Sequence, residues 1–303
     1  MHRTTRRPLP VILAFAAAGG LGACGAGEEA PGPGAAVTNG PIIDHTCTDL
    51  DRVPAEWITA AKRDLRVAYG HTSHGSQVVT GMEALRGTRG GLLDFTSAWG
   101  PSEPGVFLVD TGFDGASDLG SPDRTSWAKA TRRLLSSAAG QDRNVIIWSW
   151  CGQVDGSTKE IQLYLDQMAA LEGDYPDVRF VYMTGHLNGT GEAGNVNQRN
   201  EQIRAYCRAN ERVLFDFADI ESWDPDGATN YMLLGADDGC SYSQGGARHN
   251  WATEWVAAHP GHALAQSASV CGSCAHSEPL NCILKGRAFW WMMARLAGWD
   301  GRS

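Results

Sequence analysis

The sequence has few charged residues, no basic stripe and no nucleotide-binding glycine motif. Of its 303 residues, 19% are charged, with 25 basic and 34 acidic side chains and a net charge of −9. Nucleic-acid binding requires clustered Lys and Arg side chains that neutralise phosphates, so the sequence predicts no nucleic-acid partner. Neither Gly-x-Gly-x-x-Gly nor a Walker motif follows an expected strand, which argues against the usual nucleotide-binding folds. A hydrophobic content of 43% is instead typical of one large globular domain.

The sequence also lacks an apolar run long enough to span a bilayer, which takes about 20 residues. Its N-terminal apolar run, Leu9–Ala18, follows several arginines and is typical of a secretory signal peptide. The run leads to Leu21-Gly22-Ala23-Cys24, which resembles the bacterial lipobox, in which the cysteine is lipidated. We therefore expect a lipoprotein signal peptide over residues 1–23, a lipid on Cys24 and a flexible Gly/Pro-rich tether over residues 24–41. The lipid alone would hold the chain to a bacterial membrane (the outer membrane or the cell surface), outside the cytoplasm. The alternative is an ordinary signal peptide, with Cys24 incidental.

Beyond the tether, short apolar segments alternate with segments of helical periodicity. Strands are expected at Leu65–Tyr69, Val106–Val109, Val145–Trp150, Val178–Met183 and Val213–Phe217. Helices are expected at Pro54–Asp64, Gly75–Leu85, Arg124–Ala138, Ser157–Leu171, Asn197–Asn210, Asn250–Ala258 and Cys282–Ala297. Five strands joined by helical crossovers predict an α/β domain over residues 42–303, with a five-stranded parallel sheet covered by helices on both faces.

The chain has eight cysteines, and their chemistry depends on the compartment. In an exported protein they are expected to pair, and the disulfide candidates are Cys47, Cys240, Cys271, Cys274 and Cys282. Residues 218–282 are accordingly expected to form a disulfide-rich insertion, with a thiolate zinc site as the alternative. With one cysteine lipidated, the other seven cannot all pair, so Cys151 and then Cys207 are candidates for a free thiol. The spacing from Cys271 to His276 misses the haem-attachment pattern by one residue, so covalent haem is not expected.

Polar residues follow the expected strands, where an open parallel sheet binds its ligands. The segments concerned are Gly70–Gln77, Asp110–Gly112, Cys151–Gln153 and Gly185–Gly189, together with Asp219. They are rich in serine, histidine, asparagine and glycine. Acyl transfer requires such groups, because a nucleophile needs an adjacent base and the developing oxyanion needs hydrogen-bond donors.

These segments resemble the SGNH/GDSL hydrolase superfamily, whose members are serine esterases and acylhydrolases on a flavodoxin-like sheet. Gly70-His71-Thr72-Ser73 stands where the family has Gly-Asp-Ser, which implies that Ser73 is the nucleophile. The resemblance implies that Gly152 and Asn188 are oxyanion donors. His249, expected at the start of a late helix, takes the place of the family's base.

The resemblance leaves the acidic member of the catalytic set open. The family's Asp three residues before the base is Gly246 in this chain, so the candidates are Asp216, Asp219, Asp237 and Asp238. His71 and His186 lie on loops and are expected to line the active site. We therefore expect a lipid-anchored serine hydrolase without a cofactor, which cleaves an acyl or acetyl ester on a glycan or another extracellular molecule.

Two other functions compete with this expectation. His71, His74 and His186 could supply three nitrogen ligands to an open zinc site that activates water, which would make the protein a metal-dependent hydrolase. Alternatively, the same loops could bind a carbohydrate or a protein partner without catalysis, as parts of a surface lipoprotein.

Overall fold

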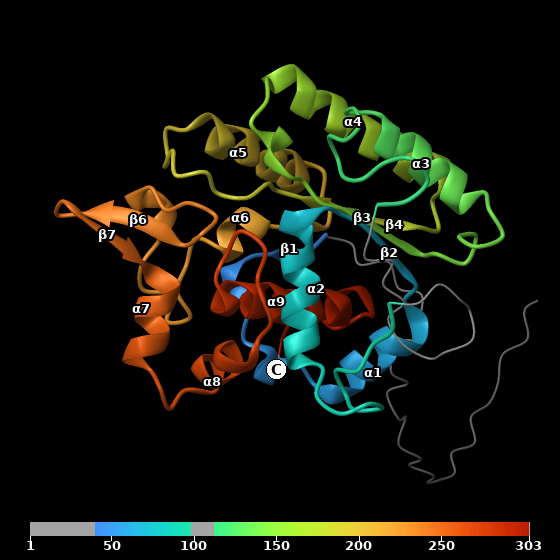
Figure 1. Cartoon of the computed structure of the whole chain (residues 1–303). Coiled ribbons are helices and arrows are strands. Elements are labelled where there is room, and N and C mark those ends of the chain that lie inside the picture. The colour runs from blue at the N-terminus through green and yellow to red at the C-terminus, as the bar shows by residue number, and fades with distance from the viewer. Residues whose placement is uncertain (1–39, 98–111, 303) are drawn as a thin grey trace, which may run out of the picture. The chain divides into compact units, whose positions relative to one another are not determined.

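Five parallel strands form the central sheet, in the order β1-β5-β4-β3-β2 (Figure 1). The computed structural model describes residues 40–97 and 112–302. Within them the strands of the sheet are β1 (Ile42–Ile43), β2 (Val67–Gly70), β3 (Val145–Trp148), β4 (Arg179–Met183) and β5 (Leu214–Phe215). Each strand runs parallel to its neighbours, and Val145 at the start of β3 lies between Val67 and Arg179. The predicted α/β class with a five-stranded parallel sheet is confirmed.

Four of these strands overlap predicted ones, and the fifth does not. β1 has only two residues, which is too short for an apolar pattern, and it pairs with β5 so that Ile42 lies opposite Leu214. The strand predicted at Val106–Val109 lies outside the described residues. The predicted signal peptide, Cys24 and the tether as far as residue 39 also lie outside them.

Helices cover both faces of the sheet, as predicted (Figure 1). Side chains alternate along each strand, so that Val67 and Tyr69 enter one hydrophobic core while Ala68 enters the other. The first core is built with α1 (Ala55–Asp64), α2 (Ser73–Leu85) and α9 (Pro279–Leu296). The second is built with α3 (Ser126–Leu135), α4 (Thr158–Asp174) and α5 (Asn195–Ala209).

Helices α2 and α9 touch backbone to backbone. A Cβ atom added at Gly81 of α2 would lie 1.8 Å from the carbonyl oxygen of Cys282 in α9. A Cβ atom at Gly286 of α9 would lie 2.4 Å from the carbonyl carbon of Gly81. Only glycine fits at either position, which explains why the apolar C-terminal segment tolerates a helix-weakening residue. This contact holds the start of α2 against the C-terminal part of the chain.

Helix α4 begins as its sequence predicts. The Ser157 side chain accepts a hydrogen bond from the Glu160 N–H, and the Glu160 carboxylate accepts one from the Ser157 N–H. This reciprocal capping box satisfies backbone donors that the first turn of a helix leaves unpaired.

The chain after β5 contains the helix predicted at Asn250–Ala258, together with further elements that the sequence did not predict. It contains α6 (Phe217–Ile220), an antiparallel hairpin of β6 (Ser241–Gln244) and β7 (Ala247–Asn250), α7 (Trp251–Ala258) and α8 (Ala263–Val270). One disulfide, Cys274–Cys282, joins residues that were predicted to pair. The other three candidates, Cys47, Cys240 and Cys271, are thiols, so the segment is not rich in disulfides within the described residues. Cys151 and Cys207 are thiols as predicted.

None of the described helices is both long enough and apolar enough to cross a membrane.

Candidate active site

Loops at the carboxyl ends of β2, β3 and β4 bring several reactive side chains together. They are Ser73 and His74 at the start of α2, Cys151 after β3, His186 after β4, Asp238 before β6 and His276 before α9. We call the rings of His74, His186 and His276 the histidine cluster. Because parallel strands end at one edge of the sheet, residues far apart in the sequence meet there.

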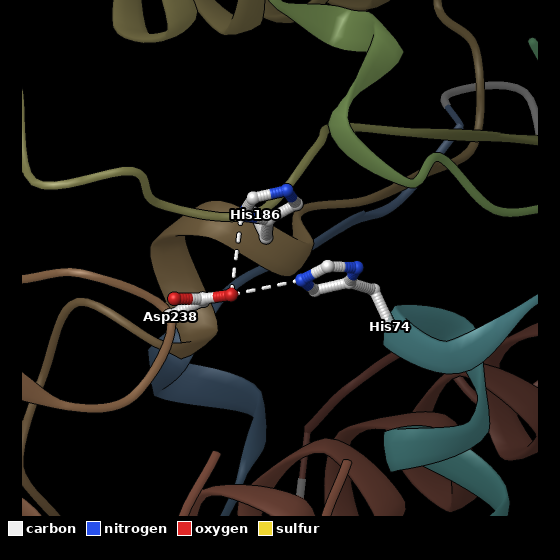
Figure 2. A group of neighbouring side chains, drawn as sticks. All are labelled: His74, His186 and Asp238. Carbon is white, nitrogen blue, oxygen red and sulfur yellow. Dashed lines mark hydrogen bonds and ion pairs between the residues drawn. The ribbon is translucent and has the colours of Figure 1, made fainter. Parts of the chain in front are cut away.

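His74 lies at the centre of this cluster, with one ring nitrogen on a carboxylate. Its Nε2 donates a hydrogen bond to Asp238 Oδ2 over 2.9 Å, and His186 Nδ1 lies 3.9 Å from the same oxygen (Figure 2). The rings of His74 and His186 stack with centroids 3.8 Å apart and planes within 5° of parallel. His74 is only 6% exposed, so Asp238 and the stacked ring fix its orientation.

The other nitrogen of His74 faces a thiol. His74 Nδ1 lies 3.2 Å from Cys151 Sγ, so Cys151, His74 and Asp238 form a continuous chain of hydrogen bonds. Burial opposes a charge on His74, but its hydrogen bonds to Asp238 and Cys151 prevail and raise its pKa to about 9. The hydrogen bond with His74 lowers the pKa of the Cys151 thiol. Burial alone would raise the pKa of Asp238. The hydrogen bond to His74 and the nearby imidazoles have the larger effect, so the pKa lies below its ordinary value. All three shifts favour the charged forms.

His186 is the neutral partner in the stack. Burial lowers its pKa, and the positive charge of His74 lowers it further, although Glu221 acts in the opposite sense. Its Nδ1 donates a hydrogen bond to the Leu187 carbonyl over 2.6 Å. The cluster therefore places an uncharged ring flat against a charged one.

Ser73 pairs with a histidine from the far end of the sequence. The Oγ of Ser73 lies 2.9 Å from His276 Nε2. The ring of His276 also stacks on that of His74, with centroids 4.4 Å apart. His276 has a φ of 60°, a left-handed conformation that is uncommon outside glycine and concentrated at functional sites. The loop that carries it is held by the disulfide Cys274–Cys282 and by a 2.6 Å hydrogen bond from Gln77 Nε2 to the Ala275 carbonyl.

A buried ion pair lies next to the cluster. Lys285 Nζ of α9 and Glu221 Oε2 are 2.6 Å apart, and neither side chain is exposed. Lys285 also donates to Gln77, and the Leu187 N–H donates to Glu221. Burial lowers the pKa of Lys285, although Glu221 opposes this. The pair thus ties together α2, α9 and the loop that carries His186.

Of the other residues predicted for the site, Gly152 lies beside Cys151, and the rest have other partners. His249 lies on β7 rather than at the start of a helix, and its Nδ1 is 2.9 Å from Glu254, not paired with Ser73. The Asn188 side chain accepts a hydrogen bond from the Thr190 hydroxyl. His71 Nδ1 donates to the Thr72 carbonyl. Gly152 begins a short 3-10 helix, Gly152–Val154, directly after Cys151.

The four candidate acids have different partners. Asp238 meets His74, whereas Asp216 binds Arg204 through two hydrogen bonds of 2.6 and 2.8 Å. Asp219 binds His45, and Asp237 accepts a hydrogen bond from the Ser241 N–H. Only Asp238 among them joins the histidine cluster through a described hydrogen bond or ion pair.

Sequence reasoning did not assign three of the residues that meet here. The sequence predicts no catalytic role for His276. It places Cys151 in a polar segment after a strand but predicts only a free thiol there, and it leaves Asp238 as one of four candidate acids. The available signals were the position of His276 shortly before the last helix and that of Cys151 directly after the most apolar strand. Neither signal identifies a partner.

Two groups among the described residues could supply ligands for a metal ion. They are His74, His186 and Asp238, and Asp44, His45 and Asp219, each set with its ligand atoms within 4.8 Å of one another. His71 from the predicted zinc set belongs to neither group. A metal ion lies close to the plane of an imidazole that binds it, along the nitrogen lone pair. Because the rings of His74 and His186 stack face to face, their planes are nearly parallel but offset. Their in-plane lone pairs therefore do not converge on one ion, and this arrangement does not fit a bound metal.

A second His–carboxylate pair lies at the carboxyl ends of β1 and β5. His45 Nδ1 is 2.5 Å from Asp219 Oδ2, and its ring stacks on Trp223 with centroids 4.4 Å apart. Burial lowers the pKa of His45, but the hydrogen bond and charge of Asp219 raise it overall. A cavity of about 250 Å³ adjoins the pair, and Asp44, Arg204 and Asp219 are among its lining residues.

Comparisons with known proteins assign no function to the chain, so the assignment depends on the geometry of the site. No family model, curated protein or solved structure matches the chain. A parallel α/β sheet carries many unrelated chemistries, so a function has to be argued from the side chains at its edge. The histidine cluster, with Ser73, Cys151 and Asp238, is the strongest candidate for that chemistry.

Proposed function

We propose that the protein is a hydrolase that cleaves an ester by nucleophilic acyl transfer, with Ser73 as the nucleophile and His276 as its base. The observation that carries this proposal is the 2.9 Å contact between Ser73 Oγ and His276 Nε2. A serine hydroxyl is a weak nucleophile until an adjacent base takes its proton, and this contact supplies that base. The Ser73 side chain is partly buried and the His276 side chain is exposed, so a substrate can reach them.

The reaction follows from the position of Ser73 at the start of α2. His276 Nε2 takes the hydroxyl proton while Ser73 Oγ attacks the carbonyl carbon, and the proton then passes to the departing alcohol. The first N–H groups of α2 have no acceptor within the helix, and the helix dipole favours negative charge at that end. These groups are suitable donors to the oxyanion, and the Gly152 N–H is a further candidate. Water then releases the acyl group, with His276 again as the base.

In this proposal Asp238 is the acidic member of the catalytic set, although it has no described hydrogen bond to His276. Its Oδ2 accepts a hydrogen bond from His74, and the ring of His74 stacks on that of His276. Among the described residues no carboxylate accepts a hydrogen bond from the His276 ring. Asp238 is therefore linked to His276 through the ring of His74 and does not orient His276 directly.

The proposed substrate is an acyl or acetyl ester on a glycan or another extracellular molecule. Its support is the N-terminal sequence, in which an apolar run, a lipobox-like segment ending at Cys24 and a flexible tether favour a lipid-anchored place outside the cytoplasm. The resemblance of Gly70–Ser73 to the SGNH/GDSL hydrolases supports the serine chemistry. A base shortly before the last helix also agrees with that family's order of residues, with His276 in place of the His249 expected from the sequence.

The test is hydrolysis of short-chain p-nitrophenyl esters by the mature protein and its variants. Ser73→Ala and His276→Gln should each lower kcat/KM by about 100-fold or more, because each removes one half of the nucleophile–base pair. Lys129→Ala, an exposed change on α3, is the matched control and should retain the wild-type rate. A Ser73→Ala variant as active as the wild type would overturn the assignment of the nucleophile. Absence of any ester hydrolysis would favour the non-catalytic binding function.

A metal-dependent hydrolase is the competing proposal, and its support beside Ser73 is the group of His74, His186 and Asp238. The nearly parallel rings of the two histidines count against it. Full esterase activity in chelator-treated, metal-free protein would exclude it. Loss of activity that zinc restores would favour it over the serine mechanism.

A further inference from the structure

We propose that Cys151, His74 and Asp238 form a second nucleophilic triad, in which the Cys151 thiol accepts an acyl group from an ester or a thioester. Cys151 Sγ lies 3.2 Å from His74 Nδ1, and His74 Nε2 lies 2.9 Å from Asp238 Oδ2. A nucleophile, a base and a group that orients the base are the three parts of such a constellation. All three are present here, whereas no carboxylate of residues 40–97 or 112–302 makes a hydrogen bond with His276 to orient it. The triad stands independently of the function proposed for Ser73.

The surroundings of Cys151 differ from those of the other four thiols in the described part of the chain. Cys47, Cys207 and Cys240 are buried, and burial raises the pKa of each thiol, to about 11 for Cys47 and about 12 for Cys240. Cys271 is partly exposed, as Cys151 is, but burial raises its pKa as well. Only Cys151 has an imidazole in contact among the described cysteines, and the Gly152 N–H also stabilises its thiolate.

The neighbours of His74 hold it in the orientation that the triad needs. Because Asp238 accepts the proton of Nε2, the opposite nitrogen, Nδ1, is directed at the thiol. His186 and His276 stack on His74, with centroids 3.8 and 4.4 Å away, and prevent the ring from turning. A base fixed in this way needs no rearrangement at the moment of reaction.

The chemistry balances without an oxidant or a further reactant besides water. The Cys151 thiolate attacks the carbonyl carbon, the bond to the alcohol or thiol leaving group breaks, and His74 Nδ1 gives its proton to that leaving group. The acyl group is then a thioester on Cys151. Water attacks this thioester while His74 Nδ1 takes a proton from it, and Cys151 leaves as the thiolate. The products are one carboxylic acid and one alcohol or thiol.

The experiment removes the serine so that only the thiol can react. In a Ser73→Ala background, nitrophenol release from p-nitrophenyl acetate is compared between Cys151→Ala and Cys271→Ala. Cys271 is the matched control, because it is the other partly exposed thiol. We expect release to fall roughly 100-fold on loss of Cys151 and to be unchanged on loss of Cys271. His74→Gln in the same background should reproduce most of the fall, and thermal unfolding of each variant checks that it is folded.

A second measurement identifies the acylated atom directly. After acid quenching, peptide mass spectrometry of the Ser73→Ala protein should locate the acetyl group on Cys151 and not on Cys271, and neutral hydroxylamine should remove it as it removes a thioester. Nitrophenol release that does not depend on Cys151, or release no faster than in buffer, overturns the proposal. Equal acetylation of Cys151 and Cys271 overturns it as well. None of these outcomes depends on whether Ser73 hydrolyses esters in the wild-type protein.

Discussion

Two regions of the same sheet edge carry a histidine on a carboxylate, and in only one of them does a described thiol or hydroxyl contact the histidine rings. His74 binds Asp238 and stacks on His186, whereas His45 binds Asp219 and stacks on Trp223. In both pairs the pKa of the histidine is raised despite burial. The second nitrogen of His74 meets the thiol of Cys151, while no described hydrogen bond joins the His45 ring to a hydroxyl or thiol.

This difference shows that a His–carboxylate pair is a structural unit that becomes catalytic only through its other neighbours. A buried ion pair also accompanies each region, Lys285–Glu221 beside the histidine cluster and Arg204–Asp216 beside His45. The supporting architecture is therefore alike on both sides. The presence of Ser73, Cys151 and His276 on one side alone is what assigns the chemistry.

The largest expected effect comes from removing the ion pair beside the histidine cluster. Lys285→Met leaves the Glu221 carboxylate buried without its cation, which should lower the free energy of unfolding by about 3–5 kcal/mol. Arg204→Met should cost less, because Asp216 keeps hydrogen bonds from the Thr184 hydroxyl and the Asp219 N–H when Arg204 is removed. Urea unfolding of both variants measures the difference. Adding Glu221→Met to the Lys285 variant should recover most of the loss, and failure to recover it would show that packing, not charge, is responsible.

The sequence alone predicts those features of the two regions that depend on local structure. Four of the strands and the cap of α4 follow from apolar runs and a capping box, which act over a few residues. The pairing of Ser73 with His276 spans 203 residues, and that of His74 with Asp238 spans 164. Nothing local encodes such contacts, because they depend on which loops the fold brings to one edge. The same reason explains why the sequence predicts His249 as the base, whereas the hairpin places His249 beside Glu254.

A smaller effect is expected in the pH dependence of the free energy of unfolding, which we compare for His74 and His45. The folded pKa of His74, about 9, lies above its unfolded value near 6.5, so its charge stabilises the fold fully below pH 6.5. This contribution is lost as the pH rises from 6.5 through 9. The free energy of unfolding of the wild type should therefore exceed that of His74→Gln by up to about 3 kcal/mol at pH 6, and the difference should shrink by pH 9.5.

His45→Gln is the comparison for that experiment. The pKa of His45 is also raised, so its contribution has the same sign and is likewise lost as the pH rises above 6.5. Its effect on ester hydrolysis should be negligible at any pH, in contrast to that of His74→Gln. A His45→Gln variant that loses esterase activity while remaining folded would contradict the assignment of the chemistry to the histidine cluster alone.

The smallest expected effect belongs to a third His–carboxylate pair, His249 with Glu254. Like the other two, this histidine stacks on another ring, but the pair lies at the surface. His249 Nδ1 lies 2.9 Å from Glu254 Oε1, and its ring stacks on Tyr242 with centroids 5.2 Å apart. Because the two side chains are 33% and 51% exposed, water and salt screen their attraction. His249→Ala should therefore change the free energy of unfolding by no more than about 0.5 kcal/mol and kcat/KM for p-nitrophenyl esters by less than about twofold. A loss of activity as large as that of His276→Gln would instead mean that the hairpin β6–β7 moves His249 onto Ser73 when the substrate binds, and that the order of residues in the sequence identified the base after all.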